Sequence, residues 1–193
     1  MPEKVRCFIA IDLDRPIRQL ITEIQEKLAS LDPFVKWVAP EHAHITLKFL
    51  GDIPLEQIPK IEESLKKAAQ MHEKTFFTTT RLNVFPHLKS PRIIFLDIEK
   101  NDQLSRLQQS LEQALIHLDL KKDQKEFLAH ITLARVRSDD GRKQISESLE
   151  KITGLTPIRQ ELKSIKLYKS TLMPQGPVYE CLFESFLKEP AHG

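Results

Sequence analysis

Cysteine and glycine are scarce in this 193-residue sequence, which contains two cysteines and five glycines. Cys7 and Cys181 form no C-x-x-C pattern, so the sequence predicts no disulfide framework. Both lie in apolar segments typical of strands, where we expect buried, reduced thiols. The few glycines and the lack of a long polar tract exclude extensive disorder.

Long apolar runs and a strong charge of one sign are also missing. No run approaches the length of a membrane span, and the first residues lack the apolar core of a signal peptide. We therefore expect a cytoplasmic protein with no membrane partner. The 29 basic residues nearly balance the 27 acidic ones, which gives a net charge of +2. A nucleic-acid ligand would need local basic patches, because the chain as a whole attracts polyanions weakly.

A tetrapeptide repeat is the most informative feature present. His44-Ile45-Thr46-Leu47 recurs as residues 130–133, so the copies begin 86 positions apart. Each copy lies in a segment typical of a strand, where alternate side chains point to opposite faces. Ile and Leu suit a core, which leaves His and Thr of each copy together on the other face.

Hydrophobic periodicity divides the chain into two similar halves. It predicts strands over residues 5–13, 34–38, 44–50, 75–84, 92–98, 127–136, 158–168 and 178–187, and helices over 15–30, 55–71, 102–118 and 142–152. Asp14 could cap the first helix, and Asn101 or Asp102 the third. We therefore predict an α+β fold with an internal pseudo-two-fold: two lobes, two antiparallel sheets lining a central cleft, and helices outside. With no linker between the halves, residues 1–193 are expected to form one domain.

Two histidines and two threonines around one space suit chemistry on a phosphoryl group. Histidine changes protonation near neutral pH, so one ring can act as a base while the other acts as an acid. Threonine hydroxyls can donate hydrogen bonds to phosphate oxygens. If charge comes from protonated histidine and a nearby arginine, this reaction needs no metal or other cofactor.

Zinc chemistry is the alternative that the histidines leave open. His42 and His44 share a face of a strand in an H-x-H pattern, and His130 could complete a zinc site. However, the repeated element is His-Thr rather than His-His, and threonine is a poor zinc ligand. The metal-free interpretation is therefore favoured.

Longer motif blocks around the repeat resemble a known family. The blocks are Arg6-Cys7-Phe8-Ile9-Ala10-Ile11, Lys36-Trp37-Val38, residues 44–51 (HITLKFLG), residues 130–135 (HITLAR), and a closing hairpin formed by residues 167–172 and Gly176-Pro177-Val178-Tyr179. In order and spacing they resemble the 2H phosphoesterase superfamily, in particular the RNA 2′,3′-cyclic phosphodiesterases also known as 2′–5′ RNA ligases. The resemblance covers nearly the whole chain.

The resemblance implies hydrolysis of an RNA 2′,3′-cyclic phosphate to a 2′-phosphomonoester, so that the 3′ oxygen leaves. It assigns the proton donor to His44 and the proton acceptor to His130, which the symmetric repeat alone cannot do. Thr46 and Thr132 would hold the phosphate.

Three further substrate-binding residues follow from the resemblance. Arg135 would bind phosphate, although strict alternation from His130 places it on the opposite face. A β-bulge or a side chain reaching round the strand end would bring it back; otherwise it is a solvent-facing charge. Phe8 would stack on a nucleobase, and Tyr168 would border the cleft, with core packing as the alternative for both.

Related functions remain open from the sequence. The chain could join 2′,3′-cyclic and 5′-hydroxyl RNA ends in the reverse reaction, act on a small cyclic nucleotide, or bind RNA ends without catalysis. The zinc-dependent hydrolase also remains. Because no heptad or interface stripe is visible, we expect a monomer.

Overall fold

The computed structural model of the chain describes residues 3–118, 120, 126–137, 141–174 and 176–190. Its strands are β1 (Lys4–Asp12), β2 (Val35–Trp37), β3 (His44–Pro54), β4 (Thr75–Phe85), β5 (Ile93–Ile98), β6 (His130–Val136), β7 (Arg159–Leu162), β8 (Ser164–Met173) and β9 (Gly176–Phe186). Its α-helices are α1 (Arg15–Lys27), α2 (Ile58–Ala69), α3 (Asp102–Leu115) and α4 (Arg142–Glu150).

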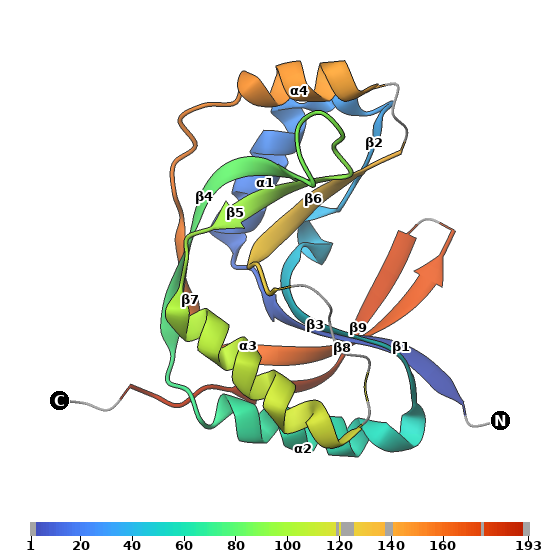
Figure 1. Cartoon of the computed structure of the whole chain (residues 1–193), viewed down its shortest axis with the longest axis vertical. Coiled ribbons are helices and arrows are strands. Elements are labelled where there is room, and N and C mark those ends of the chain that lie inside the picture. The colour runs from blue at the N-terminus through green and yellow to red at the C-terminus, as the bar shows by residue number, and fades with distance from the viewer. Residues whose placement is uncertain (1–2, 119, 121–125, 138–140, 175, 191–193) are drawn as a thin grey trace.

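The strands form a curled antiparallel sheet in the order β7-β4-β5-β6-β3-β1-β8-β9, with β2 paired to β6. One half contains β4, β5 and β6, and the other contains β3, β1, β8 and β9 (Figure 1). The halves meet where Ile45 of β3 pairs with Ile131 of β6. The predicted α+β fold with antiparallel strands is confirmed, and the two expected sheets are joined through this pair.

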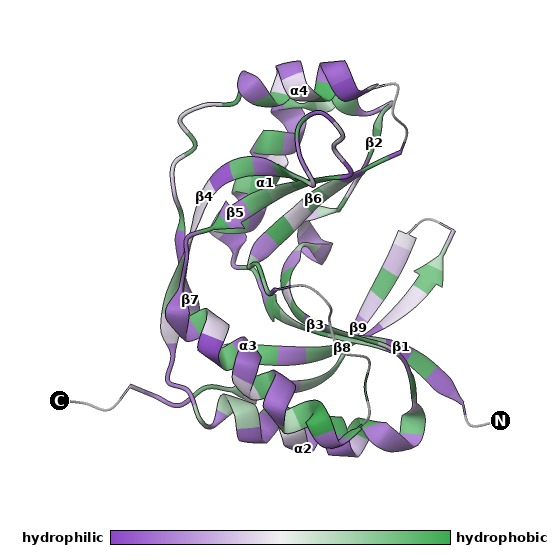
Figure 2. Ribbon diagram, viewed as in Figure 1, coloured by the Kyte–Doolittle hydropathy of each residue, from purple (hydrophilic) through white to green (hydrophobic). Residues whose placement is uncertain are grey.

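The helices cover the outer face of the curled sheet. α2 and α3 lie together against the half that contains β3, β8 and β9, while α1 and α4 lie on the other half (Figure 1). Hydrophilic and hydrophobic residues alternate along these helices, as Figure 2 shows. Ile45 and Ile131 are fully buried in the shared core. The opposite face, which we call the inner face, carries the histidines and threonines of the repeat.

Local sequence signals explain where the helices begin. Pro16 lies in the first turn of α1, where its missing N–H costs no helical hydrogen bond. The backbone N–H of Leu104 donates to Asn101 Oδ1 over 3.0 Å, so Asn101 rather than Asp102 caps α3. Asp14 precedes α1 at the cap position, but its side chain makes no capping hydrogen bond. No helix in the described ranges is long and apolar enough to cross a membrane.

Three predictions about the strands and thiols were wrong. The strand expected over residues 158–168 is two strands, because the chain breaks at Lys163: β7 pairs with β4 in one half, and β8 pairs with β1 in the other. β3 does not end at Gly51, which adopts a positive φ and lets the strand continue to Pro54. Cys181 is exposed rather than buried, since β9 lies at the edge of the sheet. Cys7 is buried, as expected.

Candidate active site

The inner face brings both copies of the repeat together at the junction of β3 and β6. From the antiparallel pair Ile45–Ile131, the register places His44 opposite Thr132 and Thr46 opposite His130. The two isoleucines point into the core, so the four polar side chains project from the inner face. Each of the four is partly exposed.

Both repeat strands carry a register shift at the same place. In the β1–β3 pairing, Ala10 faces Thr46 and Ile9 faces Lys48, so Leu47 has no partner. In the β5–β6 pairing, Ile94 faces Ala134 and Phe95 faces Thr132, so the corresponding leucine, Leu133, has no partner. A bulge of this kind reverses the alternation of faces beyond it.

These shifts decide where Arg135 and Phe49 point. Arg135 pairs with Ile93 and Thr132 pairs with Phe95, two residues along β5, so Arg135 and Thr132 share the inner face. The bulge offered as one explanation for Arg135 is therefore present. By the same logic Phe49, at the equivalent position of β3, shares the inner face with Thr46. Phe49 is 58% exposed, an unusual state for a large aromatic side chain.

The two imidazoles are held in the same way. His44 Nδ1 lies 2.7 Å from the carbonyl oxygen of His42, and His130 Nδ1 lies 2.8 Å from that of Leu128. A carbonyl oxygen only accepts, so each Nδ1 carries the hydrogen and donates it. This contact fixes the tautomer and leaves Nε2 of each ring available to give or take a proton.

The surroundings of His44 affect its charge. Burial lowers the pKa of His44 below its ordinary value, while the hydrogen bond to the His42 carbonyl and the negative charge of Asp12 act in the opposite direction. His130 lies close enough for its positive charge to lower this pKa further. In the ligand-free site, His44 is therefore mostly neutral at neutral pH, and a bound anionic phosphate would favour its protonated form.

An aromatic cluster packs beside His44. The Phe8 ring stacks on His44 with centroids 4.8 Å apart and on Tyr168 at 5.4 Å. Tyr179 of β9 meets Phe8, His44 and His42 edge-on at 5.0, 5.6 and 5.3 Å. Phe8 is only 4% exposed, so a nucleobase could reach it only if a neighbouring ring moved. In this structure Phe8 supports His44, and Tyr168 and Tyr179 border the site.

Asp12 connects this cluster to two further side chains. The Tyr168 hydroxyl donates to Asp12 Oδ1 over 2.5 Å, and Lys166 Nζ donates to Oδ2 over 2.7 Å. Burial alone would raise the pKa of Asp12, but these two hydrogen bonds together lower it. Asp12 is therefore a carboxylate at neutral pH.

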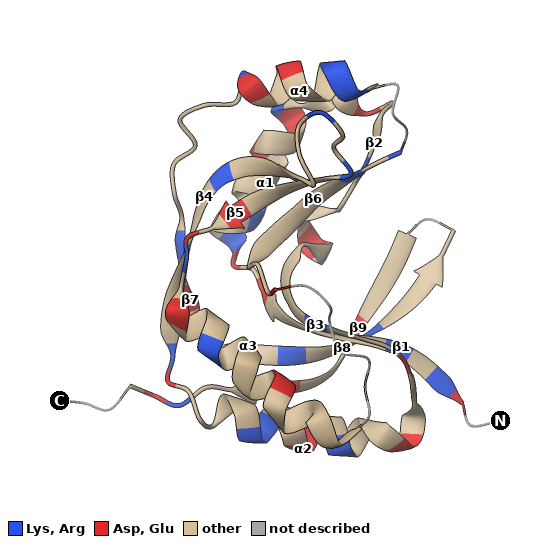
Figure 3. Ribbon diagram, viewed as in Figure 1, with Lys and Arg blue, Asp and Glu red and all other residues tan. Residues whose placement is uncertain are grey.

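Positive charge gathers at the Arg135 end of the site. Lys36 of β2 pairs directly with Arg135, and both side chains are exposed on the inner face. Burial raises the pKa of the Tyr179 hydroxyl, and the positive charge of Arg135 acts against this rise. Figure 3 shows further Lys and Arg residues in both halves of the molecule. A local pair of basic side chains of this kind is compatible with the small net charge of the chain.

A metal centre has little support in the donor geometry. Within the described ranges, no group of three or more His, Cys, Asp or Glu side chains is placed to hold a metal ion. The His42 ring, which the zinc interpretation needed, packs against Tyr179.

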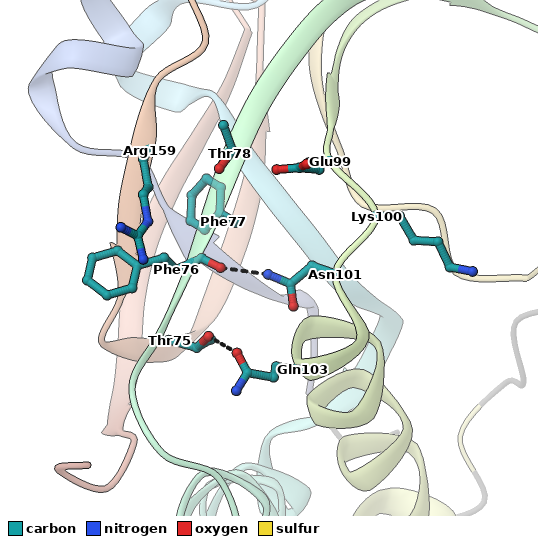
Figure 4. Close-up of a pocket in the computed structure, with 9 residues that line it drawn as sticks. All are labelled: Thr75, Phe76, Phe77, Thr78, Glu99, Lys100, Asn101, Gln103 and Arg159. Atoms are coloured by element: carbon teal, nitrogen blue, oxygen red, sulfur yellow. Dashed lines mark hydrogen bonds between the residues drawn. The ribbon is translucent and has the colours of Figure 1, made fainter. Parts of the chain in front are cut away.

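A separate hollow of about 190 Å³ lies between β4, β7 and the start of α3 (Figure 4). Its lining includes Phe76 and Arg159, whose guanidinium lies 3.9 Å from the Phe76 ring centroid. Asn101 closes one side by donating to the Phe76 carbonyl oxygen. None of the seven residues expected to act on a substrate lines this hollow, so it lies apart from the histidines and threonines of the repeat.

Comparison with known proteins identifies the family of the chain. Residues 8–172, which include both repeats and the bulges, match the family model of the 2'-5' RNA ligase superfamily. The chain belongs to this superfamily. An RNA 2',3'-cyclic phosphodiesterase of Thermotoga maritima is 33% identical over 93% of the chain and 94% of its own length. Another, from Archaeoglobus fulgidus, is 32% identical over 92% of the chain and 98% of its own length.

Solved structures share the fold of this superfamily member. The crystal structure of TT0787 of Thermus thermophilus matches 96% of the chain and 99% of its own, with a TM-score of 0.79 and 26% identity. That of E. coli LigT complexed with 3'-AMP matches 97% of the chain and 100% of its own, with a TM-score of 0.76 and 22% identity. The likeness to LigT supports the fold alone.

Sequence reasoning missed three residues at the site: Asp12, Phe49 and Tyr179. Asp12 continues the alternation of Phe8 and Ala10 along β1, so its face could have been found from the period of a strand. Phe49 required knowledge of the bulge. Tyr179 lies in the closing block, but its contact with His44 depends on how β9 folds over the inner face.

Proposed function

We propose that this protein hydrolyses RNA 2′,3′-cyclic phosphate ends to 2′-phosphomonoesters, as an RNA 2′,3′-cyclic 3′-phosphodiesterase. The relatives with this name match the chain over almost its full length. The observation that carries the proposal is the meeting of both His-x-Thr pairs on one face, across the Ile45–Ile131 pair. The proposed substrates are RNA ends, and a small cyclic nucleotide would be the smallest substrate of this kind.

The two histidines supply the proton transfers of an in-line displacement. His130 Nε2 takes a proton from water, and the water oxygen forms a bond to phosphorus. The bond between phosphorus and the 3′ oxygen breaks, and His44 Nε2 gives its proton to that oxygen. The product keeps its phosphate on the 2′ oxygen. Proton exchange with solvent then returns His130 to its neutral form and His44 to its protonated form.

Hydrogen-bond donors and a positive charge on the inner face stabilise the negative charge that develops on the phosphate. Thr46 and Thr132 donate hydroxyl hydrogens to the non-bridging oxygens from opposite sides of the β3–β6 junction. Arg135, turned onto the same face by the bulge at Leu133, adds positive charge. These residues do the work that a metal ion does in other phosphodiesterases, so no cofactor is required.

The test is a chelator-treated assay on a short RNA ending in a 2′,3′-cyclic phosphate, with the phosphate position of the product identified. We expect a 2′-phosphate from the wild-type protein and loss of turnover in both His44→Ala and His130→Ala. His72→Ala is the matched control, because His72 bonds Ser110 and is not part of the inner-face site. Full activity of either inner-face variant would reject the mechanism, and activity that depends on added zinc would support the metal alternative.

Assays with the same protein and the same RNA substrate distinguish two other functions. A reversible 2′–5′ RNA ligase would give a joined product when a 5′-hydroxyl RNA is added, since the same two rings can run the reaction backwards. A non-catalytic RNA-end binder would bind the cyclic RNA without turnover. We further propose that residues 1–193 act as one domain, as a monomer in the cytoplasm; sedimentation and cell fractionation would test these points.

A further inference from the structure

The identical motifs do not explain why His44 and His130 take different roles. Each histidine has an aspartate directly across the neighbouring strand, since Asp12 pairs with His44 and Asp97 pairs with His130. The internal repeat therefore extends to these carboxylates. Direct cross-strand partners project from the same face, so both aspartates lie on the histidine side of the sheet.

The two carboxylates are held differently. Asp97 accepts a hydrogen bond of 2.9 Å from Asn83 Nδ2 and lies 3.5 Å from Arg81 Nε, whose side chain is largely exposed. Asp12 is held by two donors from β8, Lys166 and Tyr168, at 2.7 and 2.5 Å. Asp12 is thus fixed on both oxygens, and through Tyr168 it is tied to the aromatic cluster around the His44 ring.

His44 needs such a group because its surroundings disfavour a positive charge. It is packed under Phe8 and Tyr179, and burial lowers its pKa. Other titratable groups face it from several elements. They are His130 on β6, His42 before β3, and the hydroxyl of Tyr179 on β9. Asp12 faces His44 from β1, and among the described groups whose charge acts on His44 it is the carboxylate.

We propose that Asp12, held by Lys166 and Tyr168, is a positioning residue that assigns the proton-donor role to His44. Its negative charge stabilises the imidazolium across the β1–β3 pair, and its bond to Tyr168 keeps the ring stack beneath His44 in place. Asp12 itself touches neither water nor phosphate in the reaction. This role rests on the proposed function for its effect on turnover, but the effect on His44 protonation is independent of any substrate.

The first test is an NMR titration of the His44 ring in the whole protein, with its signals assigned by their absence in His44→Ala. Asp12→Asn keeps the shape and an oxygen acceptor for Tyr168 but removes the charge, so the titration midpoint of His44 should move to lower pH. Lys166→Met removes the opposing charge, so the midpoint should move to higher pH. Asp97→Asn, the repeat-related control, should leave the His44 midpoint in place.

The second test measures turnover of the cyclic-phosphate RNA against pH. In Asp12→Asn we expect kcat to fall about tenfold, less than the loss of a whole general acid, with KM little changed. The limb of the pH profile that depends on His44 should move to lower pH. An unchanged or raised His44 midpoint in Asp12→Asn, or the same movement in Asp97→Asn, overturns the inference. A wild-type protein without turnover would reject the proposed function instead, and the titration would still decide the role of Asp12.

Discussion

Ile45 and Ile131 form the cross-strand pair that joins β3 to β6, and both side chains are completely buried. The pair fixes which histidine faces which threonine, because the residues on either side of it form the inner-face site. The core and the site therefore depend on the same two residues.

Truncation at this junction should destabilise the fold. Ile131→Ala leaves a cavity in the shared core, and we expect a loss of about 2 to 5 kcal/mol in the free energy of unfolding. Ile131→Val, which removes one methylene group, should cost about 1 kcal/mol. Denaturant titration measures both values. If Ile131→Ala folded as stably as the wild type, the pair would not hold the halves together.

Loss of either repeat threonine should slow the chemical step. Thr46→Val and Thr132→Val keep the shape but remove the hydroxyl donor, and we expect kcat to fall about 10- to 1000-fold. Thr171→Val is a suitable control, because Thr171 is an exposed threonine of β8. Its neighbour Ser170 pairs with Tyr179, so Thr171 points to the face opposite Tyr179. Equal rates for Thr46→Val and the control would remove Thr46 from the phosphate site.

Arg135 should bind the anionic substrate through its charge. In Arg135→Gln we expect a higher KM and a weaker dependence of kcat/KM on salt concentration, since one positive charge near the phosphate is lost. Lys143→Gln, which removes an exposed charge on α4, should change neither quantity. A KM that stays at the wild-type value would mean that Arg135 is only a solvent-facing charge.

Phe49 offers the exposed aromatic surface that Phe8 does not. If a nucleobase stacks on it, Phe49→Ala should weaken binding by about 1 to 3 kcal/mol, seen as a higher KM for the RNA. Phe76→Ala removes another partly exposed phenylalanine, which lies against Arg159 in the hollow of Figure 4. Similar KM values for the two variants would argue against stacking on Phe49.

The lowered pKa of His44 also predicts a pH dependence of stability. A histidine whose pKa is lower in the folded than in the unfolded chain stabilises the fold fully above its ordinary value of 6.5, and this stability is lost as the pH falls toward the folded value. His44→Asn cannot be protonated, so its free energy of unfolding should fall less over the same pH window. Urea titrations from neutral to mildly acidic pH provide the comparison. Parallel curves for the two proteins would show that burial does not affect the charge of His44.

The sequence alone determined most of the secondary structure and the shared face of histidine and threonine in each repeat. The two halves of the chain do not form separate halves of the sheet, because β8 and β9 join β1 and β3. Strand alternation is a local property, so His44 and Thr46 could be assigned to one face from their spacing of two residues. The apolar stripes of α1, α2 and α3 likewise follow from local periodicity, and their buried residues agree with it. The family resemblance added the expected reaction, which the motif geometry supports.

Only the tertiary structure decided the rest of the site. The bulges at Leu47 and Leu133 arise from pairing with β1 and β5, and they turned Phe49 and Arg135 onto the inner face. Asp12 and Tyr168 meet through strands more than 150 residues apart in the chain. Such contacts depend on strand order and register, which a local period does not encode. The sequence therefore specified which side chains share a face of each repeat strand, while the register of the sheet specified what surrounds them.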